Sequence, residues 1–208
     1  MTRVSVPPVR AAVLGLVADR VGPGPVRVGI DGVDGAGKTR FAGDLEAVLR
    51  TRGRSVVRRG LDDHLHPTER RWARGRHDPL GFFLDTYDHD AFRAAVDRDP
   101  APDVLLVDGM FLHSDPLAGC FDLVVFLDVP FAVTAARMAV RDGTPADPDH
   151  PRMRRYVEGQ RIYFRRCRPA ERAGLVVEHT DPATPRVTAD RTTLAQPCAS
   201  SREPRRTT

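Results

Sequence analysis

Long apolar runs are missing from this sequence of 208 residues. No stretch approaches the roughly 18 apolar residues that a membrane-spanning helix needs, so we expect no membrane partner. A short apolar stretch near the start, residues 11–18, follows Arg10 and ends at Asp19. No cleavage pattern of small residues comes after it, and this favours an amphipathic helix over a signal peptide.

Cysteine is also scarce. Cys120, Cys167 and Cys198 are odd in number and lie far apart in the sequence. This excludes a disulfide framework and the usual spacing of zinc ligands. The cysteine content therefore favours a reducing compartment, and we expect the protein to be cytoplasmic.

Lysine is nearly absent. Of the 32 Lys and Arg residues, 31 are Arg and only Lys38 is a lysine. A coding preference for Arg explains the ratio without any function, but the position of Lys38 is informative, because an ammonium and a guanidinium do not fit the same tight site. The net charge of +4 is modest and acidic residues are interspersed throughout, so we do not expect a nucleic-acid partner.

The pattern of apolar residues predicts an α/β fold. Short apolar strands are expected at residues 26–30, 55–59, 104–107, 123–127 and 175–178, with helical patterns between most of them. Such alternation predicts a parallel sheet with helices on both faces. Four aspartates follow these strands and would share the carboxyl edge of the sheet, where open α/β sheets bind ligands: Asp31, Asp62, Asp108 and Asp128.

A glycine-rich motif follows the first predicted strand. It matches G-x-x-x-x-G-K-[ST] in full and comprises Gly32, Val33, Asp34, Gly35, Ala36, Gly37, Lys38 and Thr39. In such a P-loop the backbone N–H groups surround a phosphate, the lysine reaches the β- and γ-phosphates, and the hydroxyl ligates Mg²⁺. A chance glycine-rich turn is the alternative, but the strand before it and the helix after it favour a P-loop. We therefore expect the three-layer P-loop NTPase fold, with ATP and Mg²⁺ as cofactors.

An acid at the end of a neighbouring strand supports Mg²⁺ in P-loop proteins. Asp108 and Asp128 both meet this description. A helix cap or a turn is the alternative for each of them, since Asp favours both. Asp128 comes shortly before Pro130, which fits a cap, so we favour Asp108, together with Thr39, as the metal ligands.

The segment from Asp62 to His66 holds two aspartates and two histidines. A kinase needs a carboxylate that accepts the proton of the attacking hydroxyl, and this segment supplies one. A metal site is the alternative, but the spacing matches no usual ligand pattern.

A lid is expected over residues 137–168. Arg137 and Arg141 lie four residues apart and so share a helix face; a polar loop and a basic helix follow them. Arginines in a lid neutralise charge on a transferring phosphoryl group, and a solvated basic face is the alternative. The chain then becomes polar, so we expect one domain over residues 1–187 and a disordered tail over residues 188–208.

Together these motifs resemble the uridine kinase family of P-loop kinases, and in particular its smaller bacterial members. The resemblance covers residues 27–187. It rests on the P-loop and on six further segments: Asp62–Pro67, Arg74–Pro79, Tyr87–Phe92, Leu106–Leu112, Phe126–Pro130 and Arg154–Gln160. It implies a kinase domain over residues 1–187, which transfers the γ-phosphate of ATP to a hydroxyl of a nucleoside or a similar small substrate.

The resemblance also implies roles for single residues. Asp62 matches the general base of the family, and Asp88 matches the acid that holds the ribose hydroxyls. Arg137 and Arg141 match lid arginines, which take part in catalysis together with Lys38.

The chain departs from the family pattern at two places. His64 and Leu65 stand where the family has an aromatic residue after the base. Only residues 93–103 lie between the Asp88 segment and the next strand, too few for the β-hairpin with which the family covers the nucleoside. We therefore expect weak discrimination between nucleosides, unless the aromatic residues of another segment cover the base: Trp72, Phe82 and Phe83.

Two other functions stay open at this point. A kinase of a non-nucleoside alcohol, such as pantothenate or a sugar acid, would use the same phosphate site. A regulatory module that binds a nucleotide without transferring phosphate would need the P-loop but not the base. The expected partner is a small-molecule substrate, and the sequence is compatible with a homo-oligomer.

Overall fold

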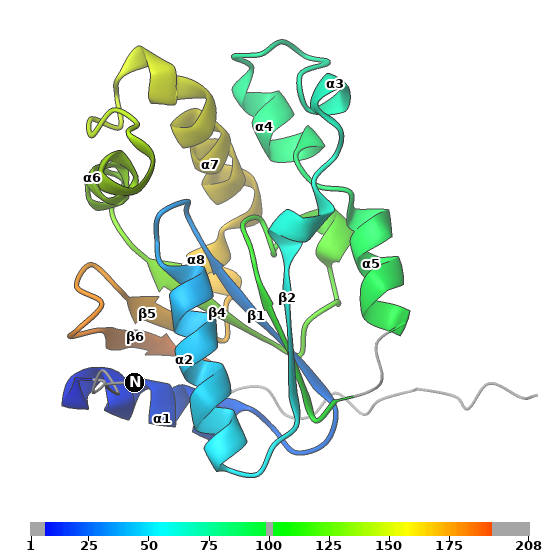
Figure 1. Ribbon diagram of the computed structural model, residues 1–208, viewed down its shortest axis with the longest axis vertical. Coiled ribbons are helices and arrows are strands. Elements are labelled where there is room, and N and C mark those ends of the chain that lie inside the picture. Colours follow the sequence, from blue (N-terminus) through cyan, green and yellow to red (C-terminus); the bar gives the residue numbers. More distant parts are fainter. Residues whose placement is uncertain (1–6, 99–101, 193–208) are drawn as a thin grey trace, which may run out of the picture.

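The structure is a computed structural model that describes residues 7–98 and 102–192. Its centre is a six-stranded sheet with the strand order β2-β3-β1-β4-β5-β6 (Figure 1). The strands β1 to β5 pair in parallel, and β6 pairs antiparallel with β5. The strand bounds are Val26–Gly32 for β1, Val56–Gly60 for β2, Val104–Asp108 for β3, Leu123–Asp128 for β4, Leu175–Glu178 for β5 and Arg186–Asp190 for β6.

Helices connect the parallel strands. The α-helices are α1 Pro8–Arg20, α2 Lys38–Thr51, α3 Thr68–Arg71, α4 Pro79–Asp85, α5 His89–Arg98, α6 Phe131–Asp142, α7 Arg154–Cys167 and α8 Pro169–Arg172. Three short 3-10 turns are η1 Leu61–His64, η2 Asp115–Leu117 and η3 Pro151–Met153. Within the described ranges, no helix combines the length and the apolar character needed to cross a membrane.

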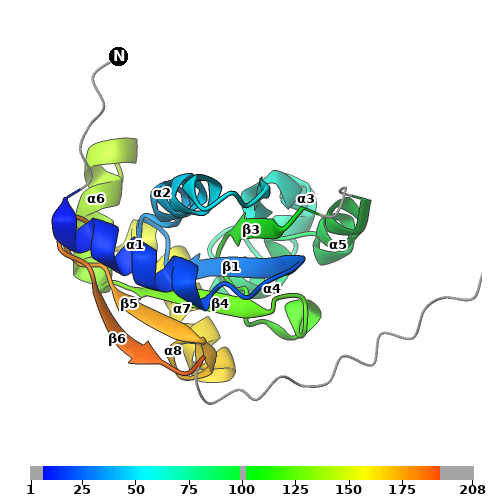
Figure 2. The same cartoon turned by 90° about the horizontal axis from the view of Figure 1, so that it is seen from below.

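The sheet buries apolar side chains on both of its faces. Val104 and Leu106 of β3 belong to the core cluster under α1 and α2, whereas Leu105 and Val107 belong to a second cluster on the opposite face. Because both faces are covered, this strand is an unbroken apolar run. Figure 2 shows the three layers, with α1 and α2 on one side of the sheet and α7 and α8 on the other. The predicted α/β fold with helices on both faces is confirmed.

Four helices stand beyond the carboxyl edge of the sheet: α3, α4, α6 and α7 (Figure 1). Of these, α4 packs on α7, and α3 adjoins α4. The buried guanidinium of Arg155 in α7 donates to the backbone carbonyls of Arg71, Gly75, Arg76 and Asp78. The loop between α3 and α4 is thereby fixed to the predicted lid helix.

The strand β6 was not expected from the sequence, and it crosses the predicted boundary at residue 187. Its side chains are largely half-buried or exposed, so it carries little of the apolar signal that marks the inner strands. The first residues of the predicted tail therefore belong to the sheet. The rest of that tail, residues 193–208, lies outside the described residues.

The segment before β3 contains no hairpin in its described part. The helix α5 occupies the chain up to Arg98, and β3 begins at Val104. The expectation that this segment is too short for a covering β-hairpin agrees with the structure.

Two glycines inside helices provide a stability prediction. A Cβ atom on Gly159 of α7 would lie 2.7 Å from the Phe82 ring and 2.8 Å from the carbonyl oxygen of Pro79. Gly159→Ala should therefore lower stability by about 1–3 kcal/mol through overpacking, although alanine is the better helix former. Thermal unfolding measures the change.

Gly43 of α2 is the matched control. A Cβ atom there would meet only the flexible end of Arg58 at 2.8 Å. Gly43→Ala should be neutral or stabilising by up to about 1 kcal/mol. Equal destabilisation by both substitutions would show that close packing at Gly159 is not the reason.

Candidate functional site

The glycine-rich motif forms a loop between β1 and α2. Gly35 and Gly37 have φ angles of 75° and 92°, a region that favours glycine. A Cβ atom on Gly35 would lie 2.9 Å from the carbonyl oxygen of Thr134, so this position has neither the conformation nor the space for a side chain. The helix α2 begins at Lys38, and the N–H groups of its first turn have no partners within the helix. The loop and the helix start together offer several N–H donors to one anion.

Lys38 is folded back over the loop. Its Nζ donates to the backbone oxygen of Val33 at 2.9 Å. Burial lowers the pKa of Lys38, while the carboxylates of Asp34, Asp31 and others oppose this shift. Partial burial of the ammonium strengthens its attraction for a phosphate, because the interaction is less screened by water.

Thr39 and Asp108 meet at the end of the sheet. The Thr39 hydroxyl donates to Oδ2 of Asp108 at 2.6 Å, so the two residues that the sequence pairs as metal ligands are neighbours. Asp128 lies elsewhere, beside Glu178, and burial followed by the Glu178 charge raises its pKa. In the described ranges, no three His, Cys, Asp or Glu side chains gather into a metal site.

The chemistry of Thr39 and Asp108 suits Mg²⁺. This ion takes oxygen ligands, keeps several waters and is usually held by only one or two carboxylates together with substrate phosphates. One carboxylate and one hydroxyl beside a phosphate-binding loop match that donor set.

Asp62 lies in η1, across from the loop. The hydroxyl of Tyr87 donates to its Oδ1 at 2.7 Å. Burial, and then the nearby charge of Asp62, raises the pKa of Tyr87 well above its usual range, so the phenol stays protonated and is the donor. The second carboxylate oxygen of Asp62 is not used by this bond. Asp62 and its neighbour Asp63 are both exposed.

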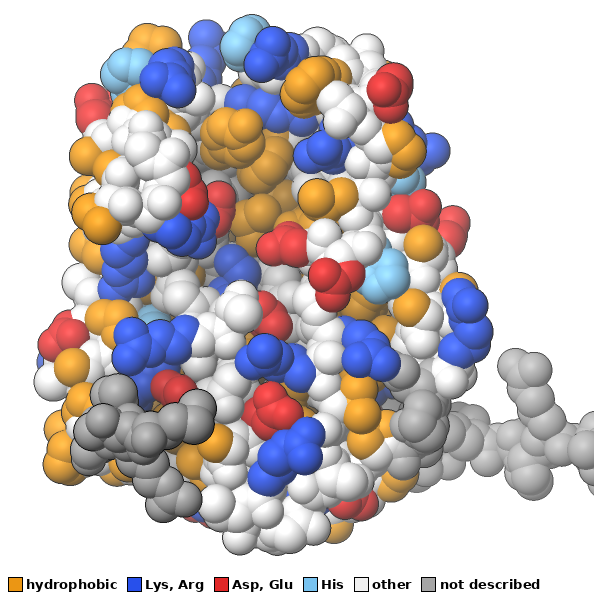
Figure 3. All heavy atoms as spheres, in the orientation of Figure 1, with side chains coloured by type: hydrophobic (Ala, Val, Ile, Leu, Met, Phe, Trp, Pro, Cys, Tyr) orange, Lys and Arg blue, Asp and Glu red, His pale blue; other side chains and the backbone are white. Residues whose placement is uncertain are grey.

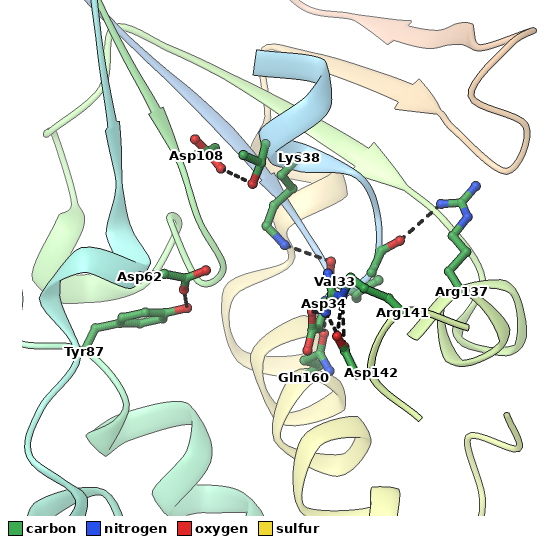
Figure 4. Close-up of polar contacts among 12 residues, drawn as sticks. Val33, Asp34, Lys38, Asp62, Tyr87, Asp108, Arg137, Arg141, Asp142 and Gln160 are labelled. Carbon is green, nitrogen blue, oxygen red and sulfur yellow. Dashed lines mark hydrogen bonds and ion pairs between the residues drawn. The ribbon is translucent and has the colours of Figure 1, made fainter. Parts of the chain in front are cut away.

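A cavity of about 330 Å³ joins these groups. Figure 4 shows Lys38 and Asp62 pointing into the same space from different elements. The lining residues are Asp34, Gly35, Gly37, Lys38, Thr39, Arg40, Asp62, Arg137, Met138 and Arg141. A larger cavity of about 650 Å³ lies at the opposite end of the sheet, and none of these residues lines it. The smaller cavity is therefore the candidate active site.

The two predicted lid arginines reach the loop in different ways. Arg137 donates to the carbonyl oxygens of Gly35, Ala36, His179 and Thr180. Its guanidinium thus binds the backbone on the outer side of the loop. This arrangement places Arg137 at the loop but commits most of its donors to protein oxygens.

Arg141 is held by two acids. Its guanidinium donates to both carboxylate oxygens of Asp142, at 2.6–2.9 Å, and lies 3.6 Å from Oδ1 of Asp34. The side chain is well exposed. Such surface pairs contribute little energy, so Arg141 can exchange these partners for an incoming anion at small cost.

Asp88 begins α5. Its Oδ1 accepts from the backbone N–H of Ala91 at 2.9 Å, and this bond is the main reason that the pKa of Asp88 is lowered. Its Oδ2 lies 3.6 Å from Nδ1 of His66. Asp88 caps the helix, and it is not among the residues that line the 330 Å³ cavity.

A buried polar cluster beneath the loop was missed from the sequence. Asp31 is fully buried and accepts hydrogen bonds from the backbone N–H of Gly32, from the ring Nδ1 of His113 and from the hydroxyl of Tyr163. One turn earlier on the same face of α7, Gln160 accepts from the backbone N–H of Asp34 at 2.7 Å. The helix α7 is thereby attached both to the end of β1 and to the loop that follows it. One sign of this cluster was present in the sequence: Asp31, an acid at the end of the first predicted strand.

A second missed network joins α1 to the loop. Arg10 is only 1% exposed and donates to His179 at 3.0 Å and to Asp44 at 2.8 Å. His179 in turn contacts the carbonyl oxygen of Ala36 at 2.9 Å. An arginine before an apolar stretch is common on surfaces, so the sequence alone held no sign of its burial.

The aromatic residues proposed as an alternative cover for a nucleobase have other roles. Phe82 and Phe83 are 7% exposed each and belong to the second core cluster. Trp72 is exposed, and the Arg76 guanidinium lies 5.0 Å from its ring. Tyr156 of α7 is 41% exposed and meets the Phe82 ring edge-on. Figure 3 shows a hollow above the sheet with hydrophobic side chains at its floor and charged ones at its rim.

Many solved structures match this architecture, among them two with TM-scores above 0.5 over most of their own length. One is a possible uridine kinase from Bacillus stearothermophilus, with a TM-score of 0.63 and 21% identity over 80% of this chain and 97% of that chain. The other is a candidate fructose transport system kinase from Silicibacter sp. TM1040, with a TM-score of 0.57 and 21% identity over 74% and 93%. No protein-family model and no curated protein matches the chain. The predicted three-layer α/β fold of P-loop proteins is confirmed, and identities this low show the fold alone.

Two histidines predict a pH dependence of stability. Burial lowers the pKa of His179 and of His89 below the ordinary value of 6.5. Below pH 6.5 the unfolded chain therefore binds protons that the folded chain resists, so the free energy of unfolding should fall as the pH drops from 6.5 towards the lowered values. Denaturant unfolding at a series of pH values measures this.

His179→Asn is the control for that dependence. This substitution should make the free energy of unfolding depend less steeply on pH in this range, whatever its effect on stability at neutral pH. The part of the pH dependence that comes from His89 should remain. A wild-type curve that is level between about pH 6.5 and 5 would contradict the lowered pKa values.

Proposed function

We propose that this protein is an ATP-dependent kinase that phosphorylates a hydroxyl of a nucleoside or a similar small compound. The observation that carries the proposal is the cavity in which Asp62 lies beside Lys38 and Thr39. A carboxylate that can take a proton there faces the groups of a phosphate-binding loop. A protein that only binds nucleotides has no use for that carboxylate.

The phosphate end of the site is the loop from Gly32 to Thr39. Its N–H groups and Lys38 would hold the β- and γ-phosphates of ATP. Thr39 and Asp108 would hold Mg²⁺, which neutralises charge on these phosphates when bound. The 2.6 Å contact between Thr39 and Asp108 supports this assignment.

The acceptor end is Asp62. In the transfer, the acceptor oxygen bonds to the γ-phosphorus, and the bond from that phosphorus to the oxygen shared with the β-phosphate breaks, which leaves ADP. The proton of the acceptor hydroxyl passes to Asp62. The Tyr87 hydroxyl orients this carboxylate through one oxygen and leaves the other for the acceptor.

The lid arginines would divide the remaining work. Arg141 exchanges its weak pairs with Asp34 and Asp142 for the transferring phosphoryl group, where a positive charge lowers the barrier. Arg137 holds the loop through Gly35 and Ala36 while lining the same cavity. Asp88 remains the proposed ligand of a sugar hydroxyl through its Oδ2, since its Oδ1 caps α5.

The proposed activity is tested by ATP consumption against a panel of nucleosides and small alcohols. At least one acceptor should stimulate ADP release. Asp62→Asn should lower turnover on that acceptor by about 10²-fold or more, because general base catalysis is lost, while binding of Mg-ADP stays nearly unchanged. Lys38→Ala should lower turnover by about 10²-fold or more as well.

Asp63→Asn is the matched control, since Asp63 neighbours Asp62 but does not line the cavity. Its effect should be mild. If Asp62→Asn and Asp63→Asn both had equally mild effects on turnover, a nucleotide-binding module without transfer activity would be favoured. If Asp63→Asn lowered turnover more than Asp62→Asn, the general base would be Asp63.

Acceptor selectivity should be weak if the acceptor is a nucleoside. No hairpin stands between α5 and β3 in the described residues, so the polar groups with which a hairpin would bind a base are missing. Phe82 and Phe83 are buried and therefore do not offer a stacking surface for a base. We expect kcat/KM for uridine, cytidine and adenosine to differ by less than about 10³-fold, because a larger ratio needs dedicated hydrogen bonds. A larger preference for one base would contradict this, and turnover of a non-nucleoside alcohol alone would identify the other acceptor class.

A further inference from the structure

His179 lies directly against the outer side of the phosphate loop. It follows β5, and its ring is packed so closely that a Cβ atom on Gly37 would lie 3.3 Å from its Cε1. The residue is 1% exposed. Its ring meets Phe41 of α2 edge-on at 5.7 Å. The ring is thus held by the loop on one side and by the first core cluster on the other.

The partners of the ring fix its protonation. Nδ1 lies 2.9 Å from the carbonyl oxygen of Ala36, which can only accept, so Nδ1 carries a hydrogen. Nε2 lies 3.0 Å from a guanidinium nitrogen of Arg10, which can only donate, so Nε2 carries none. His179 is therefore neutral and in the Nδ1–H form.

Arg10 is fixed in this position by further contacts. It forms an ion pair with Asp44 of α2 at 2.7 Å and donates to the carbonyl oxygen of Pro182 at 2.6 Å. The other charges near the ring are Arg137 from α6, Glu178 from β5 and Asp181. Burial and the two cations, Arg10 and Arg137, lower the pKa of His179, which agrees with a neutral imidazole.

The contact with Ala36 has a consequence for the site. The peptide between Ala36 and Gly37 is planar and trans, so its C=O and its N–H point in opposite directions. Because His179 holds the C=O from outside, the N–H of Gly37 is turned towards the inside of the loop. That N–H is one of the donors through which a P-loop binds phosphate.

We propose that His179, fixed in the Nδ1–H form by Arg10, is a positioning residue of the phosphate loop. It acts through the Ala36–Gly37 peptide and touches no reacting atom. This proposal rests on the proposed function, in so far as the loop binds a nucleotide. In this proposal, Arg10 of α1 and His179 after β5 contribute to nucleotide binding although both lie outside the loop motif.

Two substitutions of His179 distinguish the contact made by Nδ1 from the contact made by Nε2. His179→Asn places an amide near the position of Nδ1 and can still donate to Ala36. His179→Gln reaches the position of Nε2 and can contact Arg10 but not Ala36. Isothermal titration with Mg-ADP should give wild-type affinity within about threefold for His179→Asn and at least about tenfold weaker binding for His179→Gln, the size expected for one lost hydrogen bond that orients a donor.

Thermal unfolding of both variants and the ¹⁵N shifts of the wild-type imidazoles complete the experiment. Comparable melting temperatures with unequal affinities support positioning, and a protonated Nδ1 with an unprotonated Nε2 at neutral pH supports the tautomer. Equal affinities of the two variants, or an Nε2–H ring in the wild-type protein, would overturn the inference. Failure of the wild-type protein to bind Mg-ADP would instead contradict the proposed function.

Discussion

The site depends on one constraint: a loop whose N–H groups point inward must have partners for the carbonyl oxygens that point outward. Buried backbone oxygens without partners are costly. Here Lys38 binds the oxygen of Val33, Arg137 binds that of Gly35, and His179 and Arg137 share that of Ala36. The conformation of the loop is therefore set by groups outside the motif as much as by its glycines.

Those groups come from elements that are distant in sequence and adjacent in the fold. The order of the sheet puts β4 beside β1 and β5 beside β4, so the segments after β4 and β5 end next to the loop that follows β1. Arg137 lies in α6 after β4, and His179 follows β5 directly. Arg10 arrives from α1, which covers the same face as α2. The parallel topology thus brings three separate supports to one side of the loop.

The sequence predicted the parts of the site that are local. The P-loop, the acids at the strand ends and the pairing of Thr39 with Asp108 follow from a motif and from strand ends, because these are short-range patterns. It could not predict the burial of Arg10, since a burial of that kind depends on Asp44 and His179 arriving from other elements. The strand β6 escaped for a different reason: an edge strand with one weak apolar face gives little periodic signal. The roles of Phe82 and Phe83 were open because aromatic residues serve cores and binding sites alike.

The helix α7 links the two ends of the site. Its Gln160 and Tyr163 bind Asp34 and Asp31 at the phosphate end. On the acceptor side, Phe82 of α4 touches both Tyr156 of α7 and Phe111.

Phe111 also contacts the ring of Tyr87, which orients Asp62. A continuous path of hydrogen bonds and ring contacts therefore runs from the loop through α7 to the proposed base. A misplacement of the reacting groups by about 1 Å can lower a transfer rate by about 10²-fold. The proposed chemistry therefore requires this path as well as the loop and the carboxylate that the path connects.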